Sequence, residues 1–390
     1  MPRNVAKIDT SVSAQAFPFV DLKAQYRAIK PEVDAAIKRV MDSEQFILGP
    51  EVESLENHIA QYCGSRFAIA CASGSDALLL ALMALEVGPG DEVVTTPFTF
   101  VATAGAIARV KARPVFVDID RSTYNLDSAQ LQSAISSKTR AIIPVHLFGN
   151  PADMDTIVEI ANSASVPVIE DAAQAIGATY AGQRVGSIGF CGCFSFFPSK
   201  NLGAAGDGGM LTTNQEKLAD RLRMLHNHGG RTRYEYELIG MNSRLDALQA
   251  AILRVKLQHL DSWAAGRKHK AERYAELFHH HGLQGLVQLP QVTAKGTHVY
   301  HQYAIRALHR DKLRAFLHDR GVPSEIYYPL PLHLQRAFDY LEYKRGDLPQ
   351  SEAASREVLA LPIFPEMTGD QQARVVESVA LFYQGDNRRR

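Results

Sequence analysis

Residues 67–118 read FAIACASGSDALLLALMALEVGPGDEVVTTPFTFVATAGAIARVKARPVFVD, in which short apolar runs alternate with longer amphipathic stretches. The pattern predicts, in order, strand Phe67–Ala70, helix Ser75–Leu85, strand Glu92–Thr95, helix Ala102–Val110 and strand Pro114–Asp118. Strands that alternate with helices of about 10–15 residues indicate a mostly parallel sheet with helices on both faces. Ligands bind such sheets at the carboxyl ends of the strands, so we expect the chemistry in the segments that follow strands.

The same alternation continues to about residue 212 and predicts a three-layer α/β fold. The further elements expected are strands Ala141–Val145, Pro167–Glu170, Gly192–Phe196 and Gly209–Thr212 and helices Ser128–Ser136 and Met154–Ser163. After Asn242 the pattern changes to a long helical stretch, a strand-like run and two helices, at Leu245–His281, His301–Leu308, Asp311–Arg320 and Gly369–Tyr383. We therefore expect a large domain over residues 1–245, with an N-terminal arm, and a smaller α+β domain over residues 246–390.

Composition excludes several classes of protein. The 390 residues include 42 Lys+Arg and 42 Asp+Glu, so no overall basic field would hold a nucleic acid. The longest apolar run, Ala77–Leu85, is far shorter than the roughly 20 residues of a membrane helix, and residues 1–17 lack the apolar core of a signal peptide. The four cysteines lack zinc-finger spacing and are expected as free thiols in a reducing compartment. We expect a cytoplasmic protein without a metal site.

Two polar segments directly follow predicted strands. Residues 72–76, ASGSD, open a helix, where the N–H groups of Gly74 and Ser75 and the helix dipole can hold a phosphate. Ser75 as an ordinary N-cap is an equally good interpretation. Residues 168–174, VIEDAAQ, end a buried strand with two acids, and a buried Asp171 needs a cationic partner. That partner is either a pyridinium nitrogen or the arginine of a structural salt bridge.

A lysine enters a glycine-rich turn after another predicted strand. Residues 195–200 read SFFPSK, and glycines follow at 203, 206, 208 and 209, which indicates a tightly constrained turn. Lys200 held there loses hydration, which lowers its pKa and favours Schiff-base chemistry; an ordinary surface lysine is the alternative. The glycines do not fit GxGxxG at a strand–helix junction, so a nicotinamide-dependent oxidoreductase is poorly supported.

Three further segments offer candidate side chains. Residues 98–100, FTF, follow a strand, and an aromatic ring there either stacks on a planar cofactor or packs in the core. In GMNSR, residues 240–244, Asn242 can cap the long helix and Arg244 can pair with a carboxylate of the protein or of a substrate. His146 ends a strand and either lines the site or is a core histidine whose hydrogen bonds are satisfied.

The order of these segments along one chain resembles the fold-type-I, pyridoxal-phosphate aminotransferases that act on nucleotide-linked keto sugars. The matching motifs are SGSDAL at 73–78, TF at 99–100, EDAAQ at 170–174, SFFPSK at 195–200 and NSR at 242–244. The stretches FVDL at 19–22, ILGP at 47–50 and YPLPLH at 328–333 match the same family, so the resemblance extends from about Phe17 to Tyr383. It implies an enzyme rather than a regulatory protein on the same scaffold, because Lys200 is present.

The resemblance implies a role for each residue around the cofactor ring. Lys200 matches the lysine that forms a Schiff base with pyridoxal 5′-phosphate and then moves a proton as general base and acid. Asp171 matches the carboxylate that lies against the pyridine nitrogen, and Gln174 matches a residue near the ring hydroxyl. Phe100 matches the aromatic residue that stacks on the ring, with Phe98 as the fallback.

The resemblance also implies how the phosphate is held. Gly74, Ser75 and Ser195 match groups that bind it within one subunit. Asn242 matches an asparagine that reaches the phosphate in the neighbouring subunit. The family therefore implies a homodimer with shared active sites.

The implied reaction moves an amino group from glutamate to a nucleotide-linked keto sugar by a ping-pong mechanism. The DGG stretch at 207–209, with SFFPSK and MNSRLD, is similar to members that aminate C3 of UDP-linked 3-keto uronic acids, such as UDP-2-acetamido-3-keto-glucuronate, for cell-surface polysaccharides. Arg231 and Arg233 then hold a sugar carboxylate or nucleotide phosphates, or are solvated loop charges. Tyr327 and Tyr328 are expected on the substrate side, although some of these relatives have histidine in place of Tyr327. The alternative acceptor is a dTDP-linked 3- or 4-keto deoxysugar.

Overall fold

The central sheet joins two sets of strands. The computed structural model describes residues 17–387, so the predicted absence of a signal peptide rests on a segment outside the described residues. Within that range, one set has the order β1-β9-β8-β5 (Phe67–Cys71, Gly209–Thr213, Cys191–Ser195 and Ile169–Asp171). The other has the order β4-β2-β3 (Thr139–Ile142, Glu92–Thr95 and Arg113–Phe116). Parallel bridges from Ile142 to Val168 and from Val145 to Asp171 join β4 to β5.

The strands of this sheet are mostly parallel, as predicted. The pairs β2–β3, β2–β4 and β5–β8 are parallel, whereas β9 is antiparallel to both of its neighbours, β1 and β8. Each strand predicted between residues 67 and 213 overlaps an observed strand. The carboxyl ends of β2, β4, β5 and β8 therefore lie along the same edge of the sheet.

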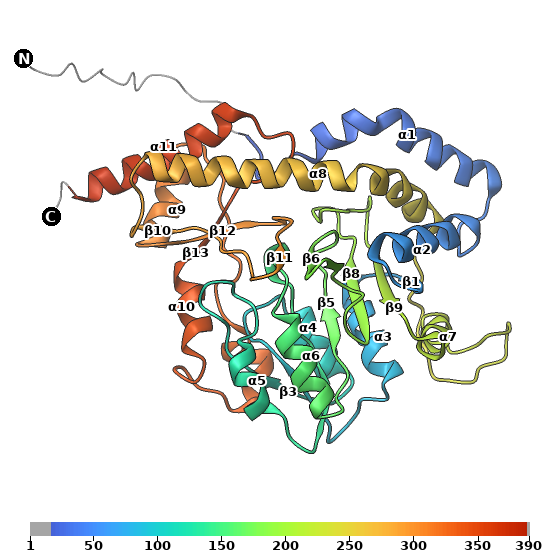
Figure 1. Ribbon diagram of the computed structural model, residues 1–390. Coiled ribbons are helices and arrows are strands. Elements are labelled where there is room, and N and C mark those ends of the chain that lie inside the picture. The colour runs from blue at the N-terminus through green and yellow to red at the C-terminus, as the bar shows by residue number, and fades with distance from the viewer. Residues whose placement is uncertain (1–16, 388–390) are drawn as a thin grey trace, which may run out of the picture.

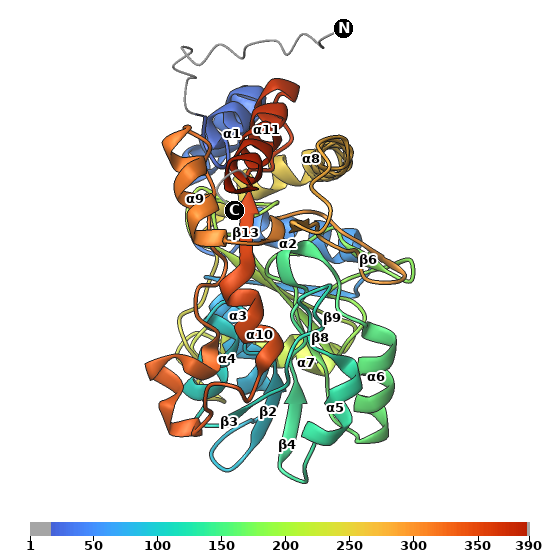
Figure 2. The same cartoon turned by 90° about the vertical axis from the view of Figure 1, so that its left-hand side faces the viewer.

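Helices cover both faces of the sheet and produce the expected three layers (Figures 1 and 2). On one face, α3 (Gly74–Ala84), α4 (Ala102–Arg109) and α7 (Glu216–Leu225) share an apolar core with the strands. On the other face, α5 (Ser128–Ala134) and α6 (Met154–Ser163) pack near β2 and β4. Beside them, α1 (Leu22–Ser43), α2 (Pro50–Cys63) and the first half of α8 (Ala247–His280) pack together over β1 and β9.

The chain after α8 builds a second sheet of order β10-β12-β13 (Val287–Gln288, Tyr303–Ala307 and Val358–Leu361). The end of α8, α9 (Arg310–Asp319) and α11 (Gly369–Asn387) pack against it in a separate apolar cluster. Between β12 and β13 the chain returns to the large sheet, where η2 (Leu332–Leu334), η3 (Arg336–Leu341) and α10 (Pro349–Glu357) contact the core around β3 and α4. The division of the chain at residue 245 stays a prediction.

Short elements complete the described part of the chain. The strands β6 (Thr179–Tyr180), β7 (Gln183–Arg184) and β11 (Gly296–Thr297) form a small sheet, and η1 (Leu147–Gly149) follows β4. Among residues 17–387, no helix has the length and apolar character required to cross a membrane.

Candidate active site

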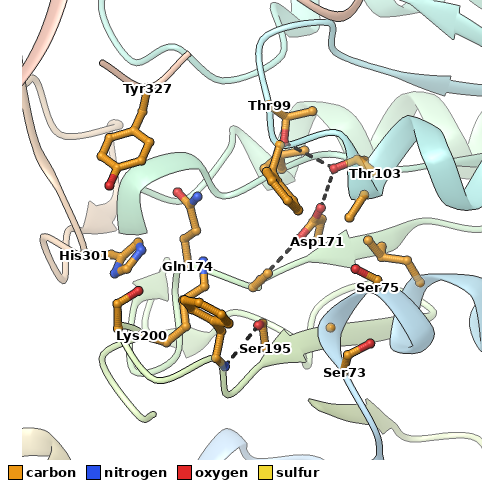
Figure 3. Close-up of a pocket in the computed structure, with 18 of the residues that line it drawn as sticks. Ser73, Ser75, Thr99, Thr103, Asp171, Gln174, Ser195, Lys200, His301 and Tyr327 are labelled. Carbon is orange, nitrogen blue, oxygen red and sulfur yellow. Dashed lines mark hydrogen bonds between the residues drawn. The ribbon is translucent and has the colours of Figure 1, made fainter. Parts of the chain in front are cut away.

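A cavity of about 600 Å³ opens at the carboxyl ends of the strands, the edge at which the sheet topology predicted chemistry (Figure 3). The predicted site residues that line it are Gly74, Ser75, Phe100, Asp171, Gln174, Ser195, Lys200, Tyr327 and Tyr328. Asn242, Arg231 and Arg233 do not line it. The sheet therefore brings together the residues predicted around the cofactor ring with those predicted around its phosphate.

Asp171 ends β5 inside the cavity wall and is buried. Thr103 Oγ1, from α4, donates a hydrogen bond of 2.7 Å to Asp171 Oδ2, and the Ala173 N–H donates one of 3.2 Å to Oδ1. Burial raises the pKa of Asp171, and these hydrogen bonds and the charge of Lys200 oppose that rise. A carboxylate in this position favours a cation in the cavity, such as a protonated pyridine nitrogen.

Lys200 follows β8 in a turn whose backbone is tightly packed. The Lys200 N–H donates to the Phe197 carbonyl at 2.8 Å, and a Cβ on Gly203 would come within 2.3 Å of the Pro198 carbonyl oxygen. This turn therefore requires glycine at 203, in agreement with the constrained turn predicted from the sequence. Burial lowers the pKa of the Lys200 amine to about 8, although the charge of Asp171 acts in the opposite direction. Near pH 7 about a tenth of the amine is uncharged and able to act as nucleophile or base.

The start of α3 offers an anion site beside Ser195. Ser73 is the N-cap and accepts the Asp76 N–H at 3.1 Å, so the alternative interpretation of Ser75 as the N-cap is wrong. The N–H groups of Gly74 and Ser75 belong to the first turn, where a helix has no acceptor of its own, and both residues line the cavity. A bound phosphate can accept from them.

Gln174, Tyr328 and Phe100 form another part of the wall. The Phe148 N–H donates to Gln174 Oε1 at 2.6 Å, and Gln174 Nε2 donates to the Tyr328 hydroxyl at 3.1 Å. The side chain of Phe100 is 56% exposed and its ring centroid lies 6.4 Å from that of Tyr328. Phe98 is fully buried in the core, so Phe100 is the ring of this pair that is open to a planar ligand.

The remaining predicted residues lie elsewhere on the surface. Asn242 is exposed and forms a backbone bridge with Asn227. Arg231 forms an exposed ion pair of 3.6 Å with Glu237 and borders a separate cavity of about 350 Å³. The guanidinium of Arg233 lies 4.9 Å from the ring centroid of Tyr234. Within a single chain these residues are therefore not part of the cavity that contains Lys200.

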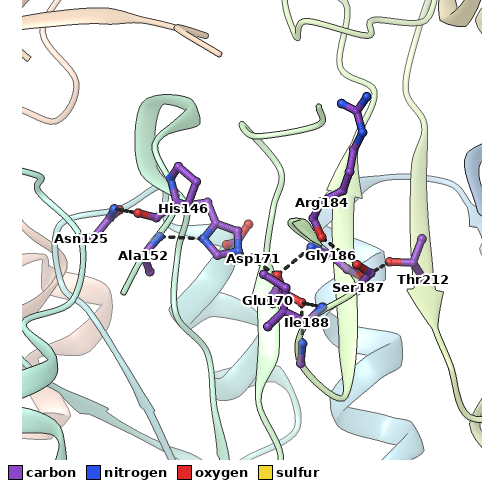
Figure 4. A network of polar contacts seen from close by, with 12 residues as sticks. Asn125, His146, Ala152, Glu170, Asp171, Arg184, Gly186, Ser187, Ile188 and Thr212 are labelled. Atoms are coloured by element: carbon purple, nitrogen blue, oxygen red, sulfur yellow. Dashed lines mark hydrogen bonds and ion pairs between the residues drawn. The ribbon is translucent and has the colours of Figure 1, made fainter. Parts of the chain in front are cut away.

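His146 belongs to a buried network behind the cavity (Figure 4). Its Nε2 lies 3.0 Å from Glu170 Oε2, and its Nδ1 accepts the Ala152 N–H at 3.0 Å. Glu170 also accepts the N–H groups of Gly186, Ile188 and Gly189 at 2.6, 2.8 and 2.7 Å. Of the two interpretations given for His146, the structure supports the satisfied core histidine.

The cavity residues that received no role from the sequence include Thr103, His301 and Gln302. Thr103, in α4, lies four residues after Thr99, which precedes the helix, and their hydroxyl oxygens are 3.2 Å apart. His301 and Gln302 come from the C-terminal part of the chain, and their distance in sequence from Lys200 carries no signal of a place in the cavity.

The fold and the cavity place the chain among the fold-type-I aminotransferases, whose cofactor is pyridoxal phosphate. More narrowly, residues 27–380 match the DegT/DnrJ/EryC1/StrS aminotransferase family, and the chain belongs to that family. The resemblance drawn from the sequence motifs is thereby confirmed, as is the assignment of the chain as an enzyme.

Known relatives span nearly the whole chain. A pleiotropic regulatory protein of Geobacillus stearothermophilus is 52% identical over 366 residues, covering 94% of this chain and 98% of that protein. A UDP-N-acetyl-3-dehydro-α-D-glucosamine 3-aminotransferase of Acidithiobacillus ferrooxidans is 48% identical, with coverage of 92% and 96%. A UDP-2-acetamido-2-deoxy-3-oxo-D-glucuronate aminotransferase of Pseudomonas aeruginosa is 45% identical, with coverage of 89% and 95%.

The same architecture occurs in solved structures. The X-ray structure of DesV from S. venezuelae, in complex with a ketimine intermediate, has a TM-score of 0.91 to this chain. The two are 44% identical in sequence, and the match covers 94% of this chain and 98% of DesV.

Proposed function

We propose that this aminotransferase uses Lys200 to move an amino group from glutamate to C3 of a UDP-linked 3-keto uronic acid, for the amino sugars of a cell-surface polysaccharide. The observation that carries this proposal is the shared cavity of Lys200, Asp171 and the start of α3. It supplies an amine of lowered pKa, a buried carboxylate and an anion site within one wall. The alternative acceptor is a dTDP-linked 3- or 4-keto deoxysugar, which needs the same three groups.

The cavity offers groups that match each part of pyridoxal phosphate. The Gly74 and Ser75 N–H groups and the Ser195 hydroxyl would hold the phosphate, and Asp171 would hold the pyridine nitrogen in its protonated form. Gln174 would lie near the ring hydroxyl and Phe100 would cover the ring. When bound, the cofactor supplies an electron-withdrawing ring that stabilises negative charge on the carbon bearing the amino group.

Lys200 supplies the proton transfers. With its pKa lowered to about 8 by burial, the free Lys200 amine would take up the proton from the carbon that bears the amino group and return it later in the reaction. The hydrogen bonds that Thr103 and Ala173 donate to Asp171 favour its charged form against the effect of burial, and that charge would favour the protonated form of the cofactor ring. The same two residues serve both halves of a ping-pong reaction, first with the donor and then with the acceptor.

We further propose that the active enzyme is a homodimer with shared sites. The exposed side chains of Phe100 and Phe197 line the cavity, and Val101 next to Phe100 in the sequence is also exposed. Other exposed apolar side chains belong to the 229–240 loop, namely Tyr234, Tyr236 and Ile239. A second subunit would cover them. Asn242, Arg231 and Arg233 would then act in the partner's cavity, Asn242 on the phosphate and the two arginines on the sugar nucleotide.

The acceptor and the cellular location are supported more indirectly. Two of the relatives have names that specify a UDP-linked sugar oxidised at C3, and one of these is a glucuronate. Tyr327 and Tyr328 line the cavity where an acceptor would enter, and we propose that they contact the sugar. The four cysteines are free and buried, which fits the reducing cytoplasm in which we place the protein.

An acceptor screen tests the substrate proposal. The enzyme is first converted to its aminated form with glutamate and freed of excess donor, and UDP-linked 3-keto uronic acid, its neutral 3-keto counterpart and dTDP-linked keto sugars are then compared. We expect the fastest recovery of the original absorption spectrum with the uronic acid, and R231Q or R233Q should reduce that preference. Faster recovery with a dTDP-linked sugar would favour the alternative acceptor.

A further inference from the structure

Ser243 is fully buried, although it lies in the chain between the exposed Asn242 and the partly buried Arg244. An antiparallel bridge pairs Asn242 with Asn227, and the Ser243 N–H donates to the His226 carbonyl at 2.9 Å. Side chains on extended backbone point alternately to opposite sides. The segment therefore directs Ser243 to the interior and Asn242 to the surface.

The hydroxyl of Ser243 joins this segment to the start of α3. Ser243 Oγ donates to Asp76 Oδ2 at 2.8 Å and accepts the Ala72 N–H at 3.2 Å. Asp76 belongs to the first turn of the helix, and Ala72 precedes it. The two hydrogen bonds thus hold both sides of residues 73–75, the phosphate turn, two of whose serines are drawn beside the cavity in Figure 3.

The segment around Ser243 is also fixed on its outer side. Arg244 Nη1 donates to Asn227 Oδ1 at 3.1 Å, beside the backbone bridge from Asn227 to Asn242. Because Ser243 is shielded from water, losing either partner of its hydroxyl would cost free energy. Asn242 is bonded directly to Ser243, so the position of the α3 start helps to set where Asn242 emerges at the surface.

We infer that Ser243 is a positioning residue that joins the phosphate turn of its own chain to Asn242, which we propose acts on the partner's phosphate. The inference rests on the proposed homodimer with shared sites. One hydroxyl then serves two cavities, because it holds the phosphate turn in its own chain and fixes the position from which Asn242 reaches the other. Loosening the phosphate turn of one subunit therefore weakens cofactor binding in the partner subunit.

Mixed dimers separate the two effects of Ser243. One subunit carries K200A and cannot form the visible band with pyridoxal phosphate, so the band reports on the wild-type subunit alone. A second substitution is added to the K200A subunit only. The measured cavity then keeps its own wild-type phosphate turn and receives Asn242 from the altered subunit. The two subunits carry different affinity tags, and the mixed dimer is purified through both.

The second substitutions remove the link from either end. S243A removes the hydroxyl, D76A removes its acceptor, and N242A tests the shared site itself. S351A is the matched control, because Ser351 is also fully buried at the start of a helix, α10, and its hydroxyl donates to the carboxylate of Asp118. Each mixed dimer is compared with the K200A–wild-type dimer for folding by circular dichroism, and D76A carries the test if S243A does not fold.

Cofactor titration of the mixed dimers, followed by the visible band, decides the role of Ser243. We expect the Kd of the wild-type cavity for pyridoxal phosphate to rise about tenfold with N242A and about three- to tenfold with S243A or D76A, and to stay unchanged with S351A. S243A and D76A combined should raise the Kd no more than the larger single effect, because both remove the same hydrogen bond.

The outcomes that contradict the inference differ from those that contradict the shared site. A Kd that rises with N242A but not with S243A or D76A would overturn the role of Ser243 and leave the shared site intact. An equal rise with S351A would also overturn it, because the effect would then be a general loss of stability. A Kd unchanged by N242A would contradict the proposed shared site, and the inference with it.

Discussion

Gly74, at the start of α3, lies against Ser195, at the end of β8, so closely that a Cβ on Gly74 would stand 2.6 Å from Ser195 Cβ and 3.1 Å from Ser195 Cα. Two segments that are far apart in the sequence thereby contribute to one anion site. The helix supplies N–H groups and the strand supplies a hydroxyl. The close approach is possible because residue 74 has no side chain.

Substitution G74A should weaken cofactor binding. The added methyl group would collide with Ser195 at the end of β8, so α3 must move away. Its first N–H groups would then no longer point at the position proposed for the phosphate. We expect the Kd for pyridoxal phosphate, measured by titration of the cofactor-free protein, to rise at least about tenfold, or about 1.4 kcal/mol. G105A, within α4 and with no atom within 4 Å of the new Cβ, should leave the Kd unchanged. Equal affinities of G74A and G105A would contradict the proposed phosphate site.

Substitution T103V should move the pH dependence of the reaction. Thr103 donates a 2.7 Å hydrogen bond that lowers the pKa of Asp171 against the effect of burial, so its removal lets that pKa rise. Asp171 would then lose its charge at a higher pH, and the acidic limb of the profile of kcat/KM against pH should shift upward. T103S keeps the hydroxyl and should keep the wild-type profile. An acidic limb that is identical in T103V would show that Asp171 does not control it.

The rate of cofactor binding should follow the protonation of Lys200. The amine attacks only in its uncharged form, so with a pKa of about 8 the rate constant should rise with pH and level off above that value. Lys256 provides an internal control, because burial also lowers its pKa to about 8, yet it lies outside the cavity and donates to the Gly203 carbonyl at 2.6 Å. Stopped-flow absorbance should give the same profile for K256M as for the wild type. A changed midpoint in K256M would show that the titration belongs to Lys256 and not to Lys200.

Glu170 should matter for stability rather than for chemistry. Its carboxylate is fully buried and accepts from three backbone N–H groups and from His146 (Figure 4). In E170Q an amide must face at least one of these donors, so we expect a loss of about 3–5 kcal/mol in the free energy of unfolding, measured in urea. D155N removes an exposed ion pair with Lys295 and should cause no measurable change. Equal stability of E170Q and the wild type would contradict this assignment.

Alternation of strands and helices was enough to predict the sheet and the edge at which the cavity lies. The reason is that the carboxyl ends of parallel strands share an edge, so Asp171, the last residue of β5, and Lys200, in the turn after β8, had to converge. Glycine at 203 was informative because the backbone of its turn leaves no room for a side chain. These signals are local in sequence, and local patterns are what a single sequence carries.

The residues that sequence reasoning missed depend on contacts between distant segments. His301 reaches the cavity only because the chain after α8 folds back against η1, which no periodicity indicates. Similarly, Asn242 is exposed outside its own chain's cavity and its backbone pairs with Asn227, a position that the NSR motif does not indicate. Its motif suggested a role at the phosphate, which the proposed second subunit would make possible.

The proposal depends above all on Lys200, and an absorption spectrum tests that dependence. Wild-type protein mixed with pyridoxal phosphate should show a visible band typical of a Schiff base, and excess glutamate should bleach it. K200A, in a cavity that is otherwise unchanged, should show neither the band nor the response to glutamate. A K200A protein that still gives a wild-type band and bleaches with glutamate would contradict the assignment of Lys200.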